Sequence, residues 1–289
     1  MDTLTVAAVA FKLRPVRGTG EYFAHLTDLI QRAYDGESDV VVLPELHVLE
    51  LLSLVPDLPE HKVAPYLAQF ADELEEWLKR ISNSSDLVIV GGSHIRKEEE
   101  ALYNVGILCR PGRAPLRYVK NNLTRYEREM WNLTPGRGLA LADGLGVTVC
   151  YDSEFPAAAL ALGEAGAWVQ ATPAWTETVR GFRRVRNGLL ARAVETQSYM
   201  VHASLVGDFG RAPVPASYGS SAIIAPSVEP FPEDPILEET ALGEEGVALA
   251  LLDRALVDEA RSRGEVSNWD DRARGDWTVA TPPADEVSS

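Results

Sequence analysis

The sequence predicts a single α/β unit built on a mixed β-sheet. Segments with the composition of buried strands alternate with helical segments along most of the 289 residues, and the later part of the chain adds a run of strands. This order is typical of layered α/β folds, and the late strands indicate a mixed sheet. A chain of this length can form one large domain, and no linker divides it. We expect residues 1–270 to form that domain and residues 271–289 to form a C-terminal tail without apolar periodicity.

The first part of the chain alternates three strands with two helices. Leu4–Phe11, the valine-rich Asp39–Leu43 and Leu87–Gly92 have the apolar composition of buried strands. Tyr22–Tyr34 is a predicted helix, and Pro65–Ile81 repeats apolar residues at helical spacing along one face.

The rest of the chain begins with a predicted hairpin, Val105–Val119, which folds back around Pro111-Gly112. Further predicted elements are helices at Ala157–Ala165 and Phe182–Gln197, and strands at Ala167–Ala171, Tyr199–Leu205, Ser221–Ile224 and Gly246–Leu252. The stretch Pro226–Gly246 holds four prolines and seven acids without a lysine or arginine, which favours a solvated surface loop over a flap or a partner-contact loop.

Charge and composition limit the possible partners. A formal net charge of −16 argues against nucleic acids and anionic membranes, because phosphate binding needs a basic face. The sequence has no signal pattern and no apolar stretch long enough to span a bilayer, so we expect a cytoplasmic protein. Two cysteines do not make a disulfide framework, and the five histidines do not pair at ligand spacings. We therefore predict no metal and no other cofactor.

Three predicted strands end on residues that can do chemistry. Glu45 follows the valine-rich strand, Lys120 ends the hairpin, and Cys150 ends an apolar run and opens a turn into a helix. In that position a thiol lies beside free backbone N–H groups, which stabilise a thiolate. The ordinary alternatives are a small buried hydrophobe for Cys150 and an ion pair for the other two. Lys120 is one of only 5 lysines against 22 arginines, and Glu127 follows it by seven residues. The second thiol, Cys109, has neither a base nor a helix start beside it and fits a buried strand.

Five motifs succeed one another along the chain. They are Leu43-Pro44-Glu45-Leu46; Tyr118-Val119-Lys120-Asn121-Asn122-Leu123 followed by Glu127; Val149-Cys150-Tyr151-Asp152-Ser153-Glu154-Phe155-Pro156; Ala191-Arg192-Ala193-Val194-Glu195-Thr196-Gln197; and Gly219-Ser220-Ser221-Ala222-Ile223-Ile224-Ala225-Pro226. In order and spacing this set resembles the nitrilase, or carbon–nitrogen hydrolase, superfamily, and the likeness extends roughly from Val6 to Trp269.

The resemblance implies a fold, a mechanism and an assembly. The implied fold is the family's four-layer α-β-β-α sandwich, in which two mixed sheets pack face to face. Cys150 would be the nucleophile and Glu45 its general base. Lys120, with the backbone N–H of Tyr151, would stabilise the tetrahedral oxyanion, and Glu127 would orient substrate or assist the base. Subunits of the family pack through helices beside the nucleophile strand, so we expect a homodimer or higher homo-oligomer.

The predicted substrate-binding residues are Tyr151, Glu154, Trp175 and Trp131. Each tryptophan either walls the pocket or belongs to the core. Glu154 stands where many family members carry arginine, which removes a reason to expect a carboxylate-bearing substrate. It either complements the helix N-terminus, as the sequence favours, or attracts an amine-bearing substrate.

Together these features indicate a cofactor-independent cysteine amidohydrolase that releases ammonia from a small linear amide. Hydrolysis of N-carbamoyl amines is the near alternative. Acyl transfer to an amine would use the same residues, and a non-catalytic scaffold would keep the same fold. Binding alone does not need all three of Glu45, Lys120 and Cys150, which argues against the scaffold.

Overall fold

A large mixed β-sheet forms the centre of the protein. The computed structural model describes residues 2–272, 275 and 278–279. The strands are β1 (Thr3–Lys12), β2 (Val40–Val42), β3 (Val88–Glu98), β4 (Ala101–Cys109), β5 (Leu116–Val119), β6 (Ala140–Ala142), β7 (Leu145–Val147), β8 (Val169–Trp175), β9 (Tyr199–Val206), β10 (Ala222–Ile224), β11 (Ile236–Glu239) and β12 (Gly246–Asp253). The α-helices are α1 (Thr19–Asp35), α2 (Val63–Leu67), α3 (Ala71–Ser85), α4 (Arg125–Glu129), α5 (Pro156–Glu164), α6 (Val179–Thr196), α7 (Arg254–Arg263) and α8 (Asn268–Asp271). Four 3-10 helices are η1 (His47–Leu54), η2 (Glu60–Lys62), η3 (Ala68–Phe70) and η4 (Cys150–Glu154).

The sheet combines parallel and antiparallel strands. Its order is β5-β4-β3-β2-β1-β9-β8-β7-β6, with β12 beside β1 and with β10 and β11 branching from β9. The runs β1-β2-β3 and β7-β8-β9 are parallel, whereas β4, β5, β6, β10, β11 and β12 pair antiparallel with their neighbours. Strand β1 is the junction, because it pairs with β12 over residues 3–10 but with β9 only at Phe11 and Lys12. The predicted α/β class with a mixed sheet is confirmed.

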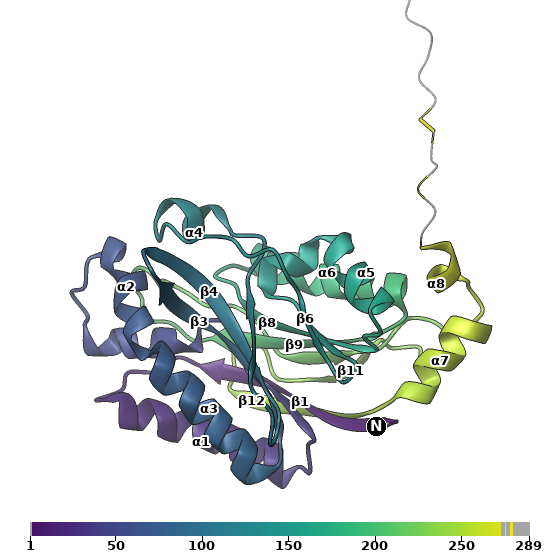
Figure 1. The fold of residues 1–289 in the computed structure, drawn as a ribbon, viewed down its shortest axis with the longest axis horizontal. Helices are drawn as coiled ribbons and strands as arrows, with labels where there is room; N and C mark the ends of the chain where they lie inside the picture. Colours follow the sequence, from purple (N-terminus) through teal and green to yellow (C-terminus); the bar gives the residue numbers. More distant parts are fainter. Residues whose placement is uncertain (1, 273–274, 276–277, 280–289) are drawn as a thin grey trace, which may run out of the picture.

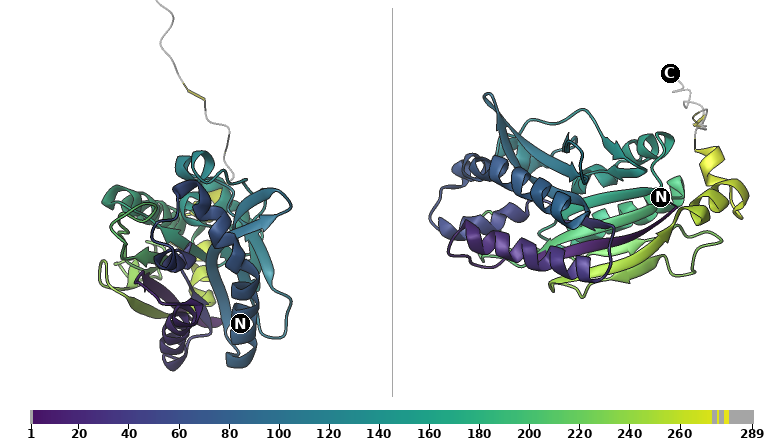
Figure 2. Two further views of the ribbon diagram at one scale, coloured as in Figure 1. Left: turned by 90° about the vertical axis from the view of Figure 1, so that its left-hand side faces the viewer. Right: turned by 60° about the horizontal axis from the view of Figure 1, so that its bottom comes forward.

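Helices cover the sheet from two sides (Figures 1 and 2). Helices α1 and α3 lie together on one side, and α5 and α6 lie together on the other. Side chains of a strand alternate between its faces, so β1 contributes to two cores. Val6 and Ala8 pack in a cluster with apolar side chains of β8, β9 and α6. Ala7, Val9 and Phe11 pack in a second cluster with apolar side chains of α1 and α3.

Three element predictions need correction. The predicted helix Pro65–Ile81 is divided into α2 and α3 by the tighter turn η3. The predicted strand Leu87–Gly92 continues to Glu98, because β4 pairs with its polar end as well. The predicted surface loop 226–246 contains strand β11, which pairs with β10. The polar end of β3 and the edge strand β11 lack the apolar alternation by which strands are recognised in a sequence.

Helix α8 ends at Asp271, so the predicted tail, residues 271–289, lies almost wholly outside the described residues. No helix within the described ranges is long and apolar enough to cross a membrane. Over the same ranges, no group of three or more His, Cys, Asp or Glu side chains is placed to hold a metal ion.

Candidate active site

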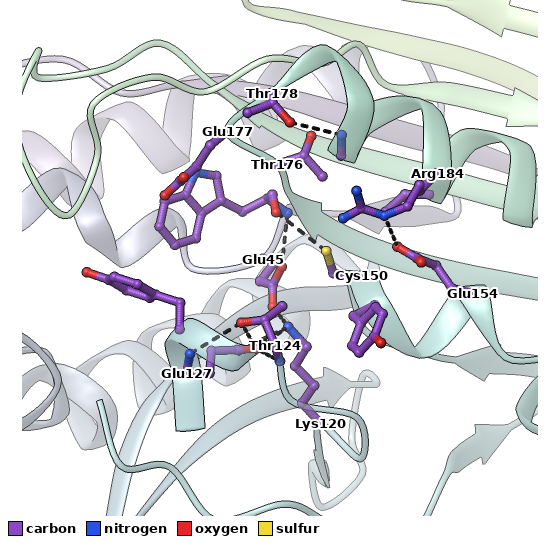
Figure 3. Close-up of a pocket in the computed structure, with 15 residues that line it drawn as sticks. Glu45, Lys120, Thr124, Glu127, Cys150, Glu154, Thr176, Glu177, Thr178 and Arg184 are labelled. Atoms are coloured by element: carbon purple, nitrogen blue, oxygen red, sulfur yellow. Dashed lines mark hydrogen bonds and ion pairs between the residues drawn. The ribbon is translucent and has the colours of Figure 1, made fainter. Parts of the chain in front are cut away.

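One pocket of about 230 Å³ collects the four predicted catalytic residues. Figure 3 shows Glu45, Lys120, Glu127 and Cys150 around it, each from a different part of the chain. Glu45 follows β2, Lys120 follows β5, Glu127 lies in α4 and Cys150 begins η4. The end of β8 and the first turns of α6 complete the lining. The site therefore brings together the end of β5, at one edge of the strand order, and the turn after β7, near the other edge.

A close main-chain contact positions Glu45. Glu45 forms an isolated parallel bridge with Ser93, and the next residue, Leu46, is left-handed with φ 52° and donates its N–H to Ser93 O at 2.9 Å. Gly92 also has a positive φ, 66°, and a Cβ there would lie 2.0 Å from Pro44 O. Only glycine allows the two main chains to approach this closely. The turn after β2 thus directs the Glu45 carboxylate into the pocket.

Lys120 lies between the two glutamates. Its Nζ donates to Glu45 Oε1 at 2.7 Å and to Glu127 Oε1 and Oε2 at 3.0 and 2.9 Å. All three side chains are buried. Burial opposes the charge on Lys120, but the two carboxylates outweigh it and raise its pKa well above the usual value. The ammonium therefore stays charged.

The two glutamates differ in how readily they take up a proton. Burial raises the pKa of Glu45, and the negative charge of Glu127 raises it further, against the opposing effect of Lys120. Burial also acts on Glu127, but Lys120 and hydrogen bonds from Asn104 and Thr124 lower its pKa. When the environments of two neighbouring carboxyl groups move their pKa values apart, the group with the higher pKa can exchange a proton and the other stays an anion. Glu45 is the carboxylate suited to proton transfer.

Two residues missing from the sequence-based list hold this cluster. Asn104 Nδ2 donates to Glu45 Oε1 at 3.0 Å and to Glu127 Oε1 at 2.9 Å. Thr124 is the N-cap of α4 in a capping box, in which its N–H donates to Glu127 Oε2 and its Oγ1 accepts from the Glu127 N–H. The Thr124 hydroxyl also donates to Glu127 Oε2. The signal for Asn104 was a polar residue opening the apolar run of β4. The signal for Thr124 was its position three residues before Glu127.

Cys150 occupies a constrained backbone position. Its φ is 45°, a left-handed value that is uncommon for a residue with a side chain and is concentrated at functional sites. The turn is held by Ser153, whose hydroxyl donates to Cys150 O at 2.7 Å, and by Asp152, which accepts from the N–H groups of Asn121 and Asn122 at 3.3 and 2.6 Å. The same aspartate thus ties the nucleophile turn to the loop after Lys120.

The expected stabilisation of a thiolate is not what the site provides at rest. Burial raises the pKa of Cys150 well above its usual value, and the negative charge of Glu45 raises it further. The Sγ atom lies 3.4 Å from Trp175 O, which is positioned to accept the thiol proton in a hydrogen bond. The resting thiol is therefore protonated, and attack by sulfur requires a base.

The main chain of Trp175 connects the acid and the thiol. Its N–H donates to Glu45 Oε2 at 3.0 Å, and its carbonyl faces Cys150 Sγ. The indole lines the pocket, and its Nε1 donates to Ser217 Oγ at 3.0 Å. Trp131, in contrast, is not among the residues that line this pocket. It is buried behind Trp175, with ring centroids 6.2 Å apart and nearly parallel planes, so its place is in the core.

The predicted substrate-binding residues Tyr151 and Glu154 both line the pocket. Glu154 lies two residues before α5 begins and pairs with Arg184 of α6, with Arg184 Nε 3.3 Å from Glu154 Oε1. Arg184 and Glu177 also line this pocket and are visible at its edge in Figure 3. The sequence showed Arg184 only as one of several nearby arginines. Arg184 is therefore a second cation in the pocket, in addition to Lys120, and it is paired with Glu154.

Comparison with known proteins agrees with this geometry. Residues 5–262 match the family model described as carbon-nitrogen hydrolase. The chain belongs to the carbon–nitrogen hydrolase family. The resemblance to the carbon–nitrogen hydrolase superfamily that the motifs suggested is thereby confirmed.

Relatives of this chain include proteins named as hydrolases and amidases. The chain is 27% identical over 274 residues to the probable hydrolase YhcX of Bacillus subtilis, covering 93% of this chain and 53% of that protein. It is 31% identical over 170 residues to the deaminated glutathione amidase of Bos taurus, covering 53% of this chain and 51% of that protein. The matches thus span about half the length of each relative. The crystal structure of Nit3 of Saccharomyces cerevisiae, a member of branch 10 of the nitrilase superfamily, superposes on this chain with a TM-score of 0.74 at 22% identity. The superposition covers 90% of this chain and 93% of Nit3, and at this identity it shows a shared fold only.

Proposed function

We propose that this carbon–nitrogen hydrolase cleaves a small linear amide through a thioester on Cys150 and releases ammonia. The observation that carries the proposal is that Lys120 bonds to both Glu45 and Glu127 in the same pocket that Cys150 lines. The amidase names of several relatives support an amide as the bond cleaved.

Acylation begins with the protonated thiol. Glu45 takes the proton from Sγ, and the sulfur attacks the amide carbonyl carbon. The carbonyl oxygen becomes an oxyanion, which the Lys120 ammonium and the backbone N–H of Tyr151 stabilise. Glu45 then gives its proton to the nitrogen, the C–N bond breaks, and ammonia leaves. The raised pKa of Glu45 suits this role because the same group must accept and return a proton.

Deacylation repeats the proton transfer with water. Glu45 removes a proton from a water molecule that attacks the thioester carbon, the C–S bond breaks, and Cys150 leaves as the thiol with the proton from Glu45. Glu127 stays an anion throughout, because Lys120, Asn104 and Thr124 all donate to it. We assign to Glu127 the placing of Lys120 and of the substrate.

An ammonia-release screen tests this proposal directly. The purified protein is incubated with short aliphatic amides, N-carbamoyl amines, ureas and nitriles, and ammonia is measured with and without an added amine as acyl acceptor. We expect release from at least one linear amide that is lost in Cys150→Ala. Release from carbamoyl compounds alone would favour the carbamoylase alternative. Acyl-amine product in place of free acid would favour the transferase, and no turnover on any class would favour the scaffold.

We also propose the assembly and the layering that the family resemblance implies. Apolar side chains of β1, β2 and β3 share one cluster with those of β8 and β9, which is the packing expected between two facing sheets. On this basis the sheet divides into the two central layers of an α-β-β-α sandwich, within a single domain of residues 1–270. We propose a cytoplasmic homodimer or higher oligomer of this unit.

A further inference from the structure

Asn104 duplicates the contacts that Lys120 makes. Its Nδ2 and the Nζ of Lys120 each donate to the same two atoms, Glu45 Oε1 and Glu127 Oε1. The main-chain carbonyl of Asn104 also accepts from the N–H of Lys120 at 2.9 Å. Asn104 is fully buried in β4. One residue thus fixes the backbone of the cation and clamps the two carboxylates that flank it.

The electrostatics of the cluster determine the orientation of this amide. Asn104 Oδ1 has no hydrogen-bond partner within the described part of the chain, although it is buried. Rotating the amide by half a turn would place that oxygen against two carboxylates, which repel it. The NH2 group faces them instead, because only a donor is stabilised there.

The donors of the cluster are fully used at rest. An ammonium has three N–H bonds and a side-chain amide has two. Lys120 makes three contacts to the two glutamates and Asn104 makes two, so each hydrogen has an acceptor. Lys120 can therefore donate to a substrate oxyanion only by giving up one of these bonds.

The bond to Glu127 Oε2 is the one that can be given up. That oxygen also accepts from the N–H and the hydroxyl of Thr124, at 2.8 and 2.9 Å. When the ammonium turns away, Thr124 still satisfies Oε2. Asn104 still bridges Glu45 Oε1 and Glu127 Oε1, and it does so without a charge of its own.

We propose that Asn104 is a positioning residue that keeps Glu45 and Glu127 ionised and in place while a Lys120 N–H turns to the substrate oxygen. The proposal rests on the catalytic roles given above for Glu45 and Lys120. Its consequence is that the donors of Asn104 lower the pH at which Glu45 becomes a working base. Removing them disfavours the charged carboxylate and moves that pH upward.

The test measures the pH dependence of Cys150 alkylation by iodoacetamide, together with kcat/KM on the amide that the screen identifies. The titratable or charged groups that face Glu45 are Lys120, Glu127, Cys150 and Tyr118. In Asn104→Leu we expect the acidic limb of both profiles to move up by about one pH unit, so that the loss of rate is largest below the new limb and smaller above it.

Two further variants keep the test decisive. Asn104→Asp keeps the shape of the side chain but replaces both donors by a carboxylate. The acidic limb of its pH profiles should therefore move further than that of Asn104→Leu. This variant carries the test if the leucine variant does not fold. Gln170→Met is the matched control. Gln170 is also buried and donates to Ala159 O, away from the pocket, so its limb should coincide with that of the parent.

A structural role for Asn104 predicts a different result. Loss of rate by the same factor at every pH, with an unmoved limb, would overturn the proposal, as would an equal shift in Gln170→Met. The alkylation arm does not depend on turnover. If the parent hydrolyses no amide but the alkylation limb still moves, the proposed reaction fails while the role of Asn104 stands.

Discussion

Replacing Lys120 by methionine separates catalysis from charge balance. Methionine preserves most of the side-chain volume but removes the ammonium and its three hydrogen bonds to Glu45 and Glu127. Two buried carboxylates then face each other with only Asn104 between them. Breaking a buried pair by removing one partner costs about 3–5 kcal/mol, because the remaining charge is uncompensated. We expect a loss of that order in the free energy of unfolding at neutral pH.

The pH dependence of this loss identifies its origin. Without the ammonium the pKa values of both glutamates rise in the folded state, so the folded chain binds protons more tightly than the unfolded chain does. The penalty therefore shrinks as the pH falls through those raised values. Urea unfolding at two pH values, one below and one above them, measures the change. The double variant Lys120→Met, Glu127→Gln removes one of the stranded charges and should recover much of the stability.

Catalysis should respond differently from stability. If Lys120 stabilises charge that develops in the transition state, its loss lowers the single-turnover acylation rate by roughly two to three decades, with little change in substrate affinity. The double variant should stay equally slow although it is more stable. A Lys120→Met protein that unfolds near the parent and acylates within a few-fold of its rate would refute the oxyanion assignment.

Three other predictions follow from single features. Cys150→Ala should abolish turnover and leave the unfolding curve unchanged. Burial raises the pKa of both thiols, but Cys150 lines the pocket beside Glu45, a base that can take its proton, so iodoacetamide should label Cys150 much faster than Cys109. Equal labelling of the two thiols in mass spectrometry would contradict this. His25 lies 2.9 Å from a Glu50 oxygen and 2.6 Å from a Glu245 oxygen; burial opposes its charge, but these carboxylates raise its pKa. The charged His25 contributes its full stabilisation below the ordinary histidine pKa, and this contribution is lost as the pH rises through the raised pKa. His25→Gln should therefore destabilise the protein more at pH 6 than at pH 9. Urea unfolding that gives the opposite order would exclude a charged His25 at pH 6. Light scattering at micromolar concentration should give at least the mass of a dimer, and a monomer mass would rule out the proposed assembly.

The sequence by itself determined the α/β class and the principal catalytic candidates. Buried parallel strands are easy to recognise in a sequence because they are short, apolar and rich in valine, as at Asp39–Leu43. Residues placed at the ends of such strands stand out against that background. Glu45, Lys120 and Cys150 were recognisable as candidates for this reason, and the resemblance to the carbon–nitrogen hydrolase superfamily gave them roles and added Glu127 as the fourth.

Only the tertiary structure decided which polar neighbours control those residues and which aromatic side chains reach the pocket. Asn104 and Arg184 come from separate elements, and no local pattern reveals that they meet the site. Thr124 could be linked to Glu127 by its spacing, but its place in the pocket follows from the fold. Trp131 and Trp175 looked equivalent in the sequence, yet one is buried behind the other. Contacts of this kind depend on how strands far apart in the chain are brought together. Burial also raises the pKa of Cys150 and keeps the thiol protonated, whereas its position at a strand end had suggested a stabilised thiolate.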